Sequence, residues 1–196
     1  MTRVPRSTNG TTAGPPLRRA TSVRRAFRLL SVSTLALIVS VAVLWAEELP
    51  EYRLKAAILY NFAQFTEWPA EVGSTLNLCI HGQDPFGSEI DSLQDKTVGM
   101  RRIAVQRKGD SDPLVGCQIV FVAPTAVGHL SRVLDEIRSR PVLSVADSPG
   151  VMRQGVILNL AVKQGKVTFE VNLQAARAAH LALSSKVLRL ATDVRE

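Results

Sequence analysis

The first 46 residues have the layout of an export signal and divide the chain into a leader and a domain. They contain seven arginines and no acidic residue, and the arginines precede an uncharged, apolar run over 29–46. A basic segment, an apolar segment and a small residue at the cut are the parts of a signal peptide. We therefore predict a signal peptide over 1–46 that is cleaved after Ala46, although Leu44 is larger than the usual residue three positions earlier. The folded domain is then expected over 47–196.

Two features of the leader leave its processing and route open. The apolar run is 18 residues long, close to the ~20 that span a bilayer, so an uncleaved inner-membrane anchor is the alternative to cleavage. Its four hydroxyl side chains lower its hydrophobicity and favour cleavage. Arg24 and Arg25, followed by Phe27, resemble a twin-arginine export signal, and an ordinary arginine-rich leader is the alternative. Each interpretation places the folded part on the far side of the membrane.

The leader also explains the basic composition of the whole chain. The formal net charge is +7, from 24 basic and 17 acidic residues. Removing the leader's seven arginines from the 24 basic residues leaves 17, equal to the 17 acidic ones. A neutral domain without a basic stripe lacks the charge that tracks phosphates, so we expect no nucleic-acid partner.

Two cysteines, Cys79 and Cys117, lie in apolar segments that are typical of strands. In an oxidising compartment, an even pair is most simply explained by a disulfide. On the chain-entropy account, closing a loop of this length stabilises a domain by about 3 to 4 kcal/mol. The alternative is two reduced thiols packed as small hydrophobic side chains.

The remaining pattern predicts one α/β domain. Apolar side chains recur at helical spacing from Pro50 to Trp68, with Pro69 ending the helix, and again over 124–138. Apolar segments over 76–80, 103–106, 117–122 and 142–145 predict strands, and a short helix is predicted over 85–93. Strands that alternate with helices form a mainly parallel sheet covered on both faces.

The C-terminal third adds a hairpin and a helix to this pattern. Segments 156–162 and 167–171 flank a turn that contains Gly165, which predicts a β-hairpin. The stretch over 173–190 predicts a helix in one or two pieces, with a break at Ser184 and Ser185. The predicted fold is therefore a three-layer α/β/α sandwich with a mixed, mainly parallel sheet and an appended C-terminal hairpin.

No sequence motif indicates catalysis. The three histidines, His81, His129 and His180, do not have metal-ligand spacing. The chain lacks a nucleophile elbow, a phosphate-binding loop and a dinucleotide fingerprint. We expect neither an enzyme nor a bound metal or cofactor.

Five polar or aromatic residues are candidates for contact with a partner or ligand. Asn61 lies near the apolar stripe of the first helix, and capping of a nearby backbone group is its alternative role. Trp68 lines a pocket or packs in the core. Asp147 follows a strand at the carboxyl edge of the sheet, where ligands bind, or it begins a turn. Glu170 and Asn172 share the polar face of their strand, which contacts a partner or only solvent.

A series of blocks resembles the YfiR family of periplasmic regulators. The first is KAAILYNFAQFTEWP over 55–69, and further matches follow in order over the whole domain. They are Cys79 and Gly82, Phe86, Gly116 and Cys117, 145–147, 155–159, FEVN over 169–172, Ala175 and Ala176, and SSKVLRLA over 184–191.

This resemblance implies a function. It implies repression of an inner-membrane diguanylate cyclase, a GGDEF protein, through its periplasmic domain, which lowers cyclic-di-GMP and biofilm formation. It further implies a homodimer, an outer-membrane lipoprotein antagonist and a disulfide between Cys79 and Cys117. The second cysteine pair of some members is absent here, because 148–154 contains no cysteine. The alternative function is a periplasmic small-ligand sensor that feeds a histidine kinase or receptor.

Overall fold

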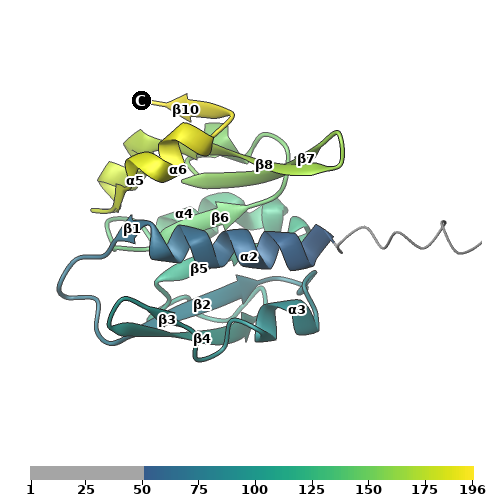
Figure 1. Ribbon diagram of the computed structural model, residues 1–196. Coiled ribbons are helices and arrows are strands. Elements are labelled where there is room, and N and C mark those ends of the chain that lie inside the picture. Colours follow the sequence, from purple (N-terminus) through teal and green to yellow (C-terminus); the bar gives the residue numbers. More distant parts are fainter. Residues whose placement is uncertain (1–50) are drawn as a thin grey trace, which may run out of the picture. The chain divides into compact units, whose positions relative to one another are not determined.

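A mixed eight-stranded sheet forms the centre of the protein (Figure 1). The computed structural model describes residues 51–196, so the predicted signal peptide lies outside the described residues. The strands run in the order β10-β8-β7-β6-β5-β2-β4-β3. Neighbouring strands are parallel except in the pairs β3/β4 and β7/β8. Their bounds are β2 (Thr75–His81), β3 (Thr97–Val98), β4 (Arg101–Lys108), β5 (Ile119–Val122), β6 (Leu143–Ala146), β7 (Leu158–Lys163), β8 (Lys166–Asn172) and β10 (Asp193–Arg195).

Helices cover both faces of this sheet. The helical elements are α2 (Glu51–Gln64), α3 (Ser88–Asp91), the 3-10 turn η2 (Pro124–His129), α4 (Leu130–Glu136), the 3-10 turn η3 (Val151–Gln154), α5 (Leu173–Ala178) and α6 (Ser185–Leu190). On one face, α2 packs with α3 and α6 in the larger core. On the other, η2, α4 and η3 form a second core. The predicted three-layer α/β/α sandwich with an appended hairpin, β7–β8, is confirmed.

Alternation along the strands divides side chains between the two cores. In β2, Leu78 and Ile80 face α2, whereas Cys79 between them faces the core under α4. All four residues of β5 and all four of β6 are buried, because helices cover these central strands on both faces. This double burial explains why both segments are almost entirely apolar.

Several element ends differ from the prediction. The first helix ends at Gln64 rather than Trp68, because Thr66 and Glu67 form β1 (Thr66–Glu67), which pairs with β9 (Ala182–Leu183). The C-terminal helix is broken, as the serine pair indicated, and Ser184 has an extended backbone immediately before α6. The break contains β9, and the chain then returns to the sheet as β10 beside β8.

A disulfide joins Cys79 of β2 to Cys117, which lies two residues before β5. Both cysteines are buried beneath α4, and their Cα atoms are 5.9 Å apart. The bond therefore ties β2 to the segment that leads into β5, inside the second core. Within residues 51–196, no helix is long and apolar enough to cross a membrane.

Candidate partner-binding groove

An apolar groove of about 310 Å³ lies between α2, β8 and α6. The edge-to-face pair of Phe62 and Phe169, with ring centroids 4.9 Å apart, packs at its base. The groove is lined by Ile58, Asn61, Phe62, Phe65, Val167, Thr168, Phe169, Val187 and Leu190. Its volume lies within the range of pockets that bury small ligands or single anchoring side chains of a partner.

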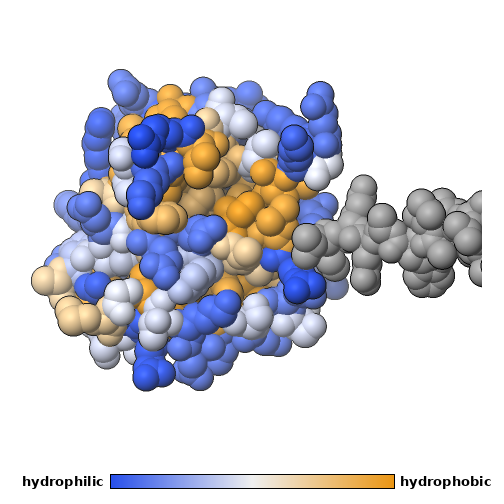
Figure 2. Space-filling view, in the orientation of Figure 1, coloured by the Kyte–Doolittle hydropathy of each residue, from blue (hydrophilic) through white to orange (hydrophobic). Residues whose placement is uncertain are grey.

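The groove belongs to an exposed apolar surface with a lysine beside it. Figure 2 shows hydrophobic residues gathered over α6 and beside β8, while the lower half of this face is mostly polar. Leu190 in the groove wall is 72% exposed. The ammonium of Lys186 lies 5.3 Å from the ring centroid of Phe65, a cation–π distance. This surface offers apolar anchoring sites with positive charge at their edge.

Asn61 is the predicted contact residue that borders this groove. It is exposed on α2 and also borders a second hollow, between α2 and α3. Within residues 51–196 its side-chain amide makes no hydrogen bond, although its backbone carbonyl accepts from the amide of Phe65. Its amide is therefore free to donate to and accept from a partner.

Asp147 lies in a buried charged cluster beneath the start of α2. Its Oδ2 accepts hydrogen bonds from the Lys55 ammonium at 2.7 Å and from the Tyr52 hydroxyl at 3.2 Å. Lys55 also pairs with Glu51 and lies 4.4 Å from the centroid of the Tyr52 ring. The side chains of Lys55 and Asp147 are 4% and 1% exposed, so this ion pair is shielded from water.

Two pKa shifts follow from this arrangement. Burial disfavours the charged form of Lys55, but hydrogen bonds to Asp147 and Glu51 outweigh it and raise the pKa of Lys55 above its ordinary value. Burial and the negative charge of Asp147 also raise the pKa of the Tyr52 hydroxyl. Lys55 therefore stays a cation, and Tyr52 stays a neutral donor. The cluster fastens the first turn of α2 to the end of β6.

The other three predicted contact residues lie elsewhere. Trp68 is half-buried against the larger core and donates from its indole nitrogen to the Ala63 carbonyl at 3.0 Å. Asn172 caps α5 by accepting from the Ala175 amide at 2.9 Å. Glu170 is half-exposed on the face of β8 opposite Phe169, so the groove and Glu170 lie on different sides of the sheet. The five residues do not form one site.

Sequence patterns predicted only Asn61 of the groove and only Asp147 of the cluster as contact residues. Val187 and Leu190 complete the groove wall, and their spacing of three on α6 was the available signal. The pairing of Lys55 with Glu51 was readable from their spacing of four residues. Its pairing with Asp147 was not, because 92 residues separate the two and only the fold brings them together.

Chemical groups for metal binding are not gathered anywhere in the described domain. Among residues 51–196, no group of three or more His, Cys, Asp or Glu side chains is placed to hold a metal ion. His81 is buried at the end of β2, and burial lowers the pKa of its imidazole.

The fold and the groove define an α/β/α domain with an apolar recess on one helical face. The model of the YfiR/HmsC-like family matches residues 52–192, which is nearly the whole described domain. This protein belongs to the YfiR/HmsC-like family.

Among solved structures, the chain resembles a conserved domain protein from Vibrio cholerae O1 biovar El Tor str. N16961. The TM-score is 0.50 at 8% sequence identity, and the match covers 74% of this chain. It covers 60% of the Vibrio protein, so the chain spans less than two thirds of that protein's length. At this identity the likeness shows the fold alone.

Proposed function

We propose that this protein is a periplasmic regulatory binding protein that represses an inner-membrane diguanylate cyclase. Repression lowers cyclic-di-GMP signalling and biofilm formation. The observation that carries the proposal is membership of the YfiR/HmsC-like family over 52–192. The buried disulfide and the export-type leader fit a protein that folds in an oxidising compartment. The protein acts by contact and not by catalysis.

The groove between α2, β8 and α6 is the surface that we assign to the cyclase's periplasmic domain. Apolar side chains of the partner fill it, and Asn61 at its border supplies a directional hydrogen bond. Hot spots of interfaces are apolar recesses of this kind, surrounded by polar groups. The ammonium of Lys186 beside the groove favours acidic residues on the partner, which align the two proteins before contact.

Two further partners complete the proposal. The protein is a homodimer, and an outer-membrane lipoprotein relieves repression by competing for the regulator. Both come from family membership, and neither is assigned a surface. Such an antagonist relieves repression only if it binds the free regulator more tightly than the cyclase-bound regulator, because a shifted equilibrium requires differential binding.

Leu190→Asp tests the assigned surface. The side chain is 72% exposed, so a charge is tolerated by the fold but opposes burial of the groove against a partner. In a deletion strain, the Leu190→Asp protein is expected to leave cyclic-di-GMP near the deletion level. The matched control is Met100→Asp, because Met100 is 96% exposed and lies at the β3–β4 turn on the other edge of the sheet.

The control variant should restore low cyclic-di-GMP. If both variants restore low cyclic-di-GMP at equal protein levels, the groove is not part of the interface. Equal loss of repression would indicate a general effect of the added charge. Only loss confined to Leu190→Asp supports the groove.

A further inference from the structure

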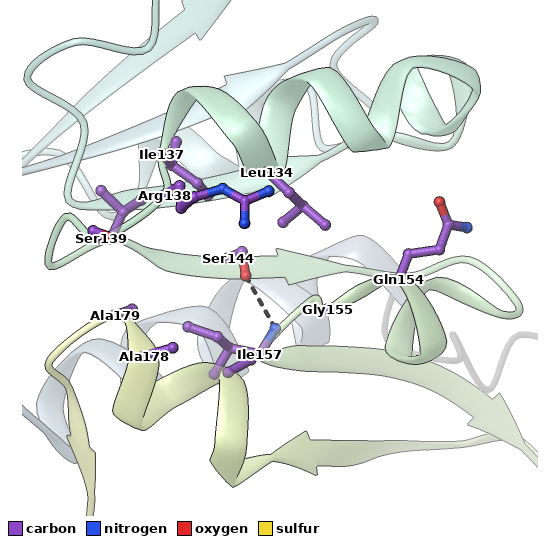
Figure 3. Close-up of a pocket in the computed structure, with 12 residues that line it drawn as sticks. Leu134, Ile137, Arg138, Ser139, Ser144, Gln154, Gly155, Ile157, Ala178 and Ala179 are labelled. Atoms are coloured by element: carbon purple, nitrogen blue, oxygen red, sulfur yellow. Dashed lines mark hydrogen bonds between the residues drawn. The ribbon is translucent and has the colours of Figure 1, made fainter.

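Another pocket lies between α4 and α5, and none of the five predicted contact residues lines it (Figure 3). Its volume is about 350 Å³, within the range of small-molecule sites. Leu134 and Ile137 form the wall on the α4 side. Ser144 of β6 and Ile157, just before β7, form the floor. The pocket is thus a gap between two helices that exposes part of the sheet.

Small residues on α5 account for the gap. Ala175, Ala178 and Ala179 recur at spacings of three and four, so their methyl groups share one face of the helix. A methyl group does not reach across to Leu134, and a larger side chain at any of the three positions would enter the space. Protein interiors normally close such gaps. The alanine face leaves this one open.

The floor of the pocket carries an unused donor. Ser144 is 2% exposed, and its Oγ accepts a hydrogen bond from the Ile157 amide at 3.0 Å, drawn as the dashed line in Figure 3. Within residues 51–196, its hydroxyl hydrogen has no acceptor. A buried donor without an acceptor is costly. A polar atom of a bound molecule or a water would satisfy it.

A guanidinium lies at the mouth of the pocket. Arg138, the one charged residue among the lining side chains, extends from the end of α4 toward the centre of the pocket (Figure 3). Its side chain is 73% exposed and pairs with Asp135, which leaves several of its five donors free. Ser139 and Gln154 lie at the two ends of the opening. The lining therefore combines an apolar interior with one guanidinium at the entrance.

We infer that this pocket binds a small monocarboxylate with an apolar body. The carboxylate meets Arg138 at the mouth, and the body lies against the alanine face of α5. A cationic molecule of the same shape is disfavoured by Arg138. Because no residue lines both this pocket and the groove, the inference stands independently of the proposed cyclase contact.

The probes are sodium octanoate, octan-1-ol and octylamine, added to the purified protein and followed by amide chemical shifts in NMR. Octanoate is expected to give saturable shifts around Ser144 and Ala178. The affinity for octylamine should be about threefold to fivefold lower than that for octanoate, because one partly exposed charge pair contributes an effect of that size. Equal affinity for octanoate and octylamine, or no saturable shift with octanoate, would overturn the inference.

Two variant pairs locate the site. Ala178→Leu fills the pocket from an exposed helix position and should abolish octanoate binding, whereas Gln174→Leu, also exposed on α5, should not. Arg138→Gln should weaken octanoate roughly threefold to fivefold and leave octan-1-ol unchanged. Arg132→Gln, on α4 outside the pocket, should change neither. Undiminished octanoate binding by the Ala178→Leu protein would place the ligand elsewhere and contradict the assignment.

Discussion

The Lys55–Asp147 pair is the most deeply buried ion pair in the described domain, at side-chain exposures of 4% and 1%. A buried pair of this kind contributes little net stability compared with apolar residues, but loss of one partner leaves an uncompensated charge. Lys55 retains Glu51, which is nearly half-exposed and only partly compensates. The pair therefore fixes the position of α2 on the sheet, beside the groove that α2 helps to form.

We predict that Asp147→Asn lowers the free energy of unfolding by about 3 kcal/mol, because the Lys55 ammonium loses its buried counter-charge. Chemical denaturation of the purified protein measures this. The matched control is Asp135→Asn, which removes an exposed partner of Arg138 and should cost at most about 1 kcal/mol. A cost for Asp147→Asn as small as the control's would mean that the pair does not fasten α2.

At this scale the sequence predicted where Asp147 lies but not what it contacts. Its position after an apolar strand placed it at the carboxyl edge of the sheet, as observed. The Lys55 partner depends on how α2 crosses that edge, which local spacing does not encode. Asn61 shows the converse: helical spacing placed it near the apolar stripe, yet its side chain is exposed. Helical spacing predicts which face of a helix is apolar, but it does not fix the exposure of a residue at the border of that face.

Among the elements, the pairing of β2 and β5 carries the disulfide. We predict that Cys79→Ser lowers the free energy of unfolding by about 3 to 4 kcal/mol under oxidising conditions, because the 38-residue loop is no longer closed in the unfolded chain. Under reducing conditions the variant and the unmodified protein should differ much less. Denaturation with and without reductant measures both. An unmodified protein equally stable in both conditions would contradict this role.

The polar face of β8 is the second element with an open role. Glu170 is half-exposed, and its carboxylate makes no hydrogen bond or ion pair within residues 51–196. We predict that Glu170→Lys weakens repression through a second partner contact, on the face of β8 opposite the groove. The free energy of unfolding should stay within about 0.5 kcal/mol, as expected for a surface substitution. Cyclic-di-GMP in complemented cells and denaturation of the purified variant measure the two effects. A loss of several kcal/mol would make Glu170 structural instead.

Element prediction succeeded where burial is uniform and failed where elements are short. The double burial of β5 and β6 produced continuous apolar runs that identify central strands. The two-residue strands β1 and β9 have no period to detect, and their pairing ends the first helix four residues before Trp68. Likewise, β10 is three residues long and was not anticipated. Such elements depend on tertiary contacts.

For the whole molecule, alternation of strands and helices was sufficient to predict a three-layer sandwich, and ordered family blocks predicted the family. The groove was not predicted, because it requires three elements that are distant in sequence to leave a space between them. The same limit applies to the α4–α5 pocket, where an alanine face has meaning only opposite Leu134. Recesses arise from what side chains leave unfilled, which a linear pattern does not record.

The measurement that tests the central proposal most directly is cellular cyclic-di-GMP in a strain that lacks this protein, compared with the parent and with the strain complemented by the full chain. A repressor of a diguanylate cyclase predicts a rise on deletion and a return to the parental level on complementation. The rise should disappear when the catalytic domain of the partner cyclase is also inactivated. An unchanged cyclic-di-GMP level on deletion, with the protein expressed in the parent, would contradict the account.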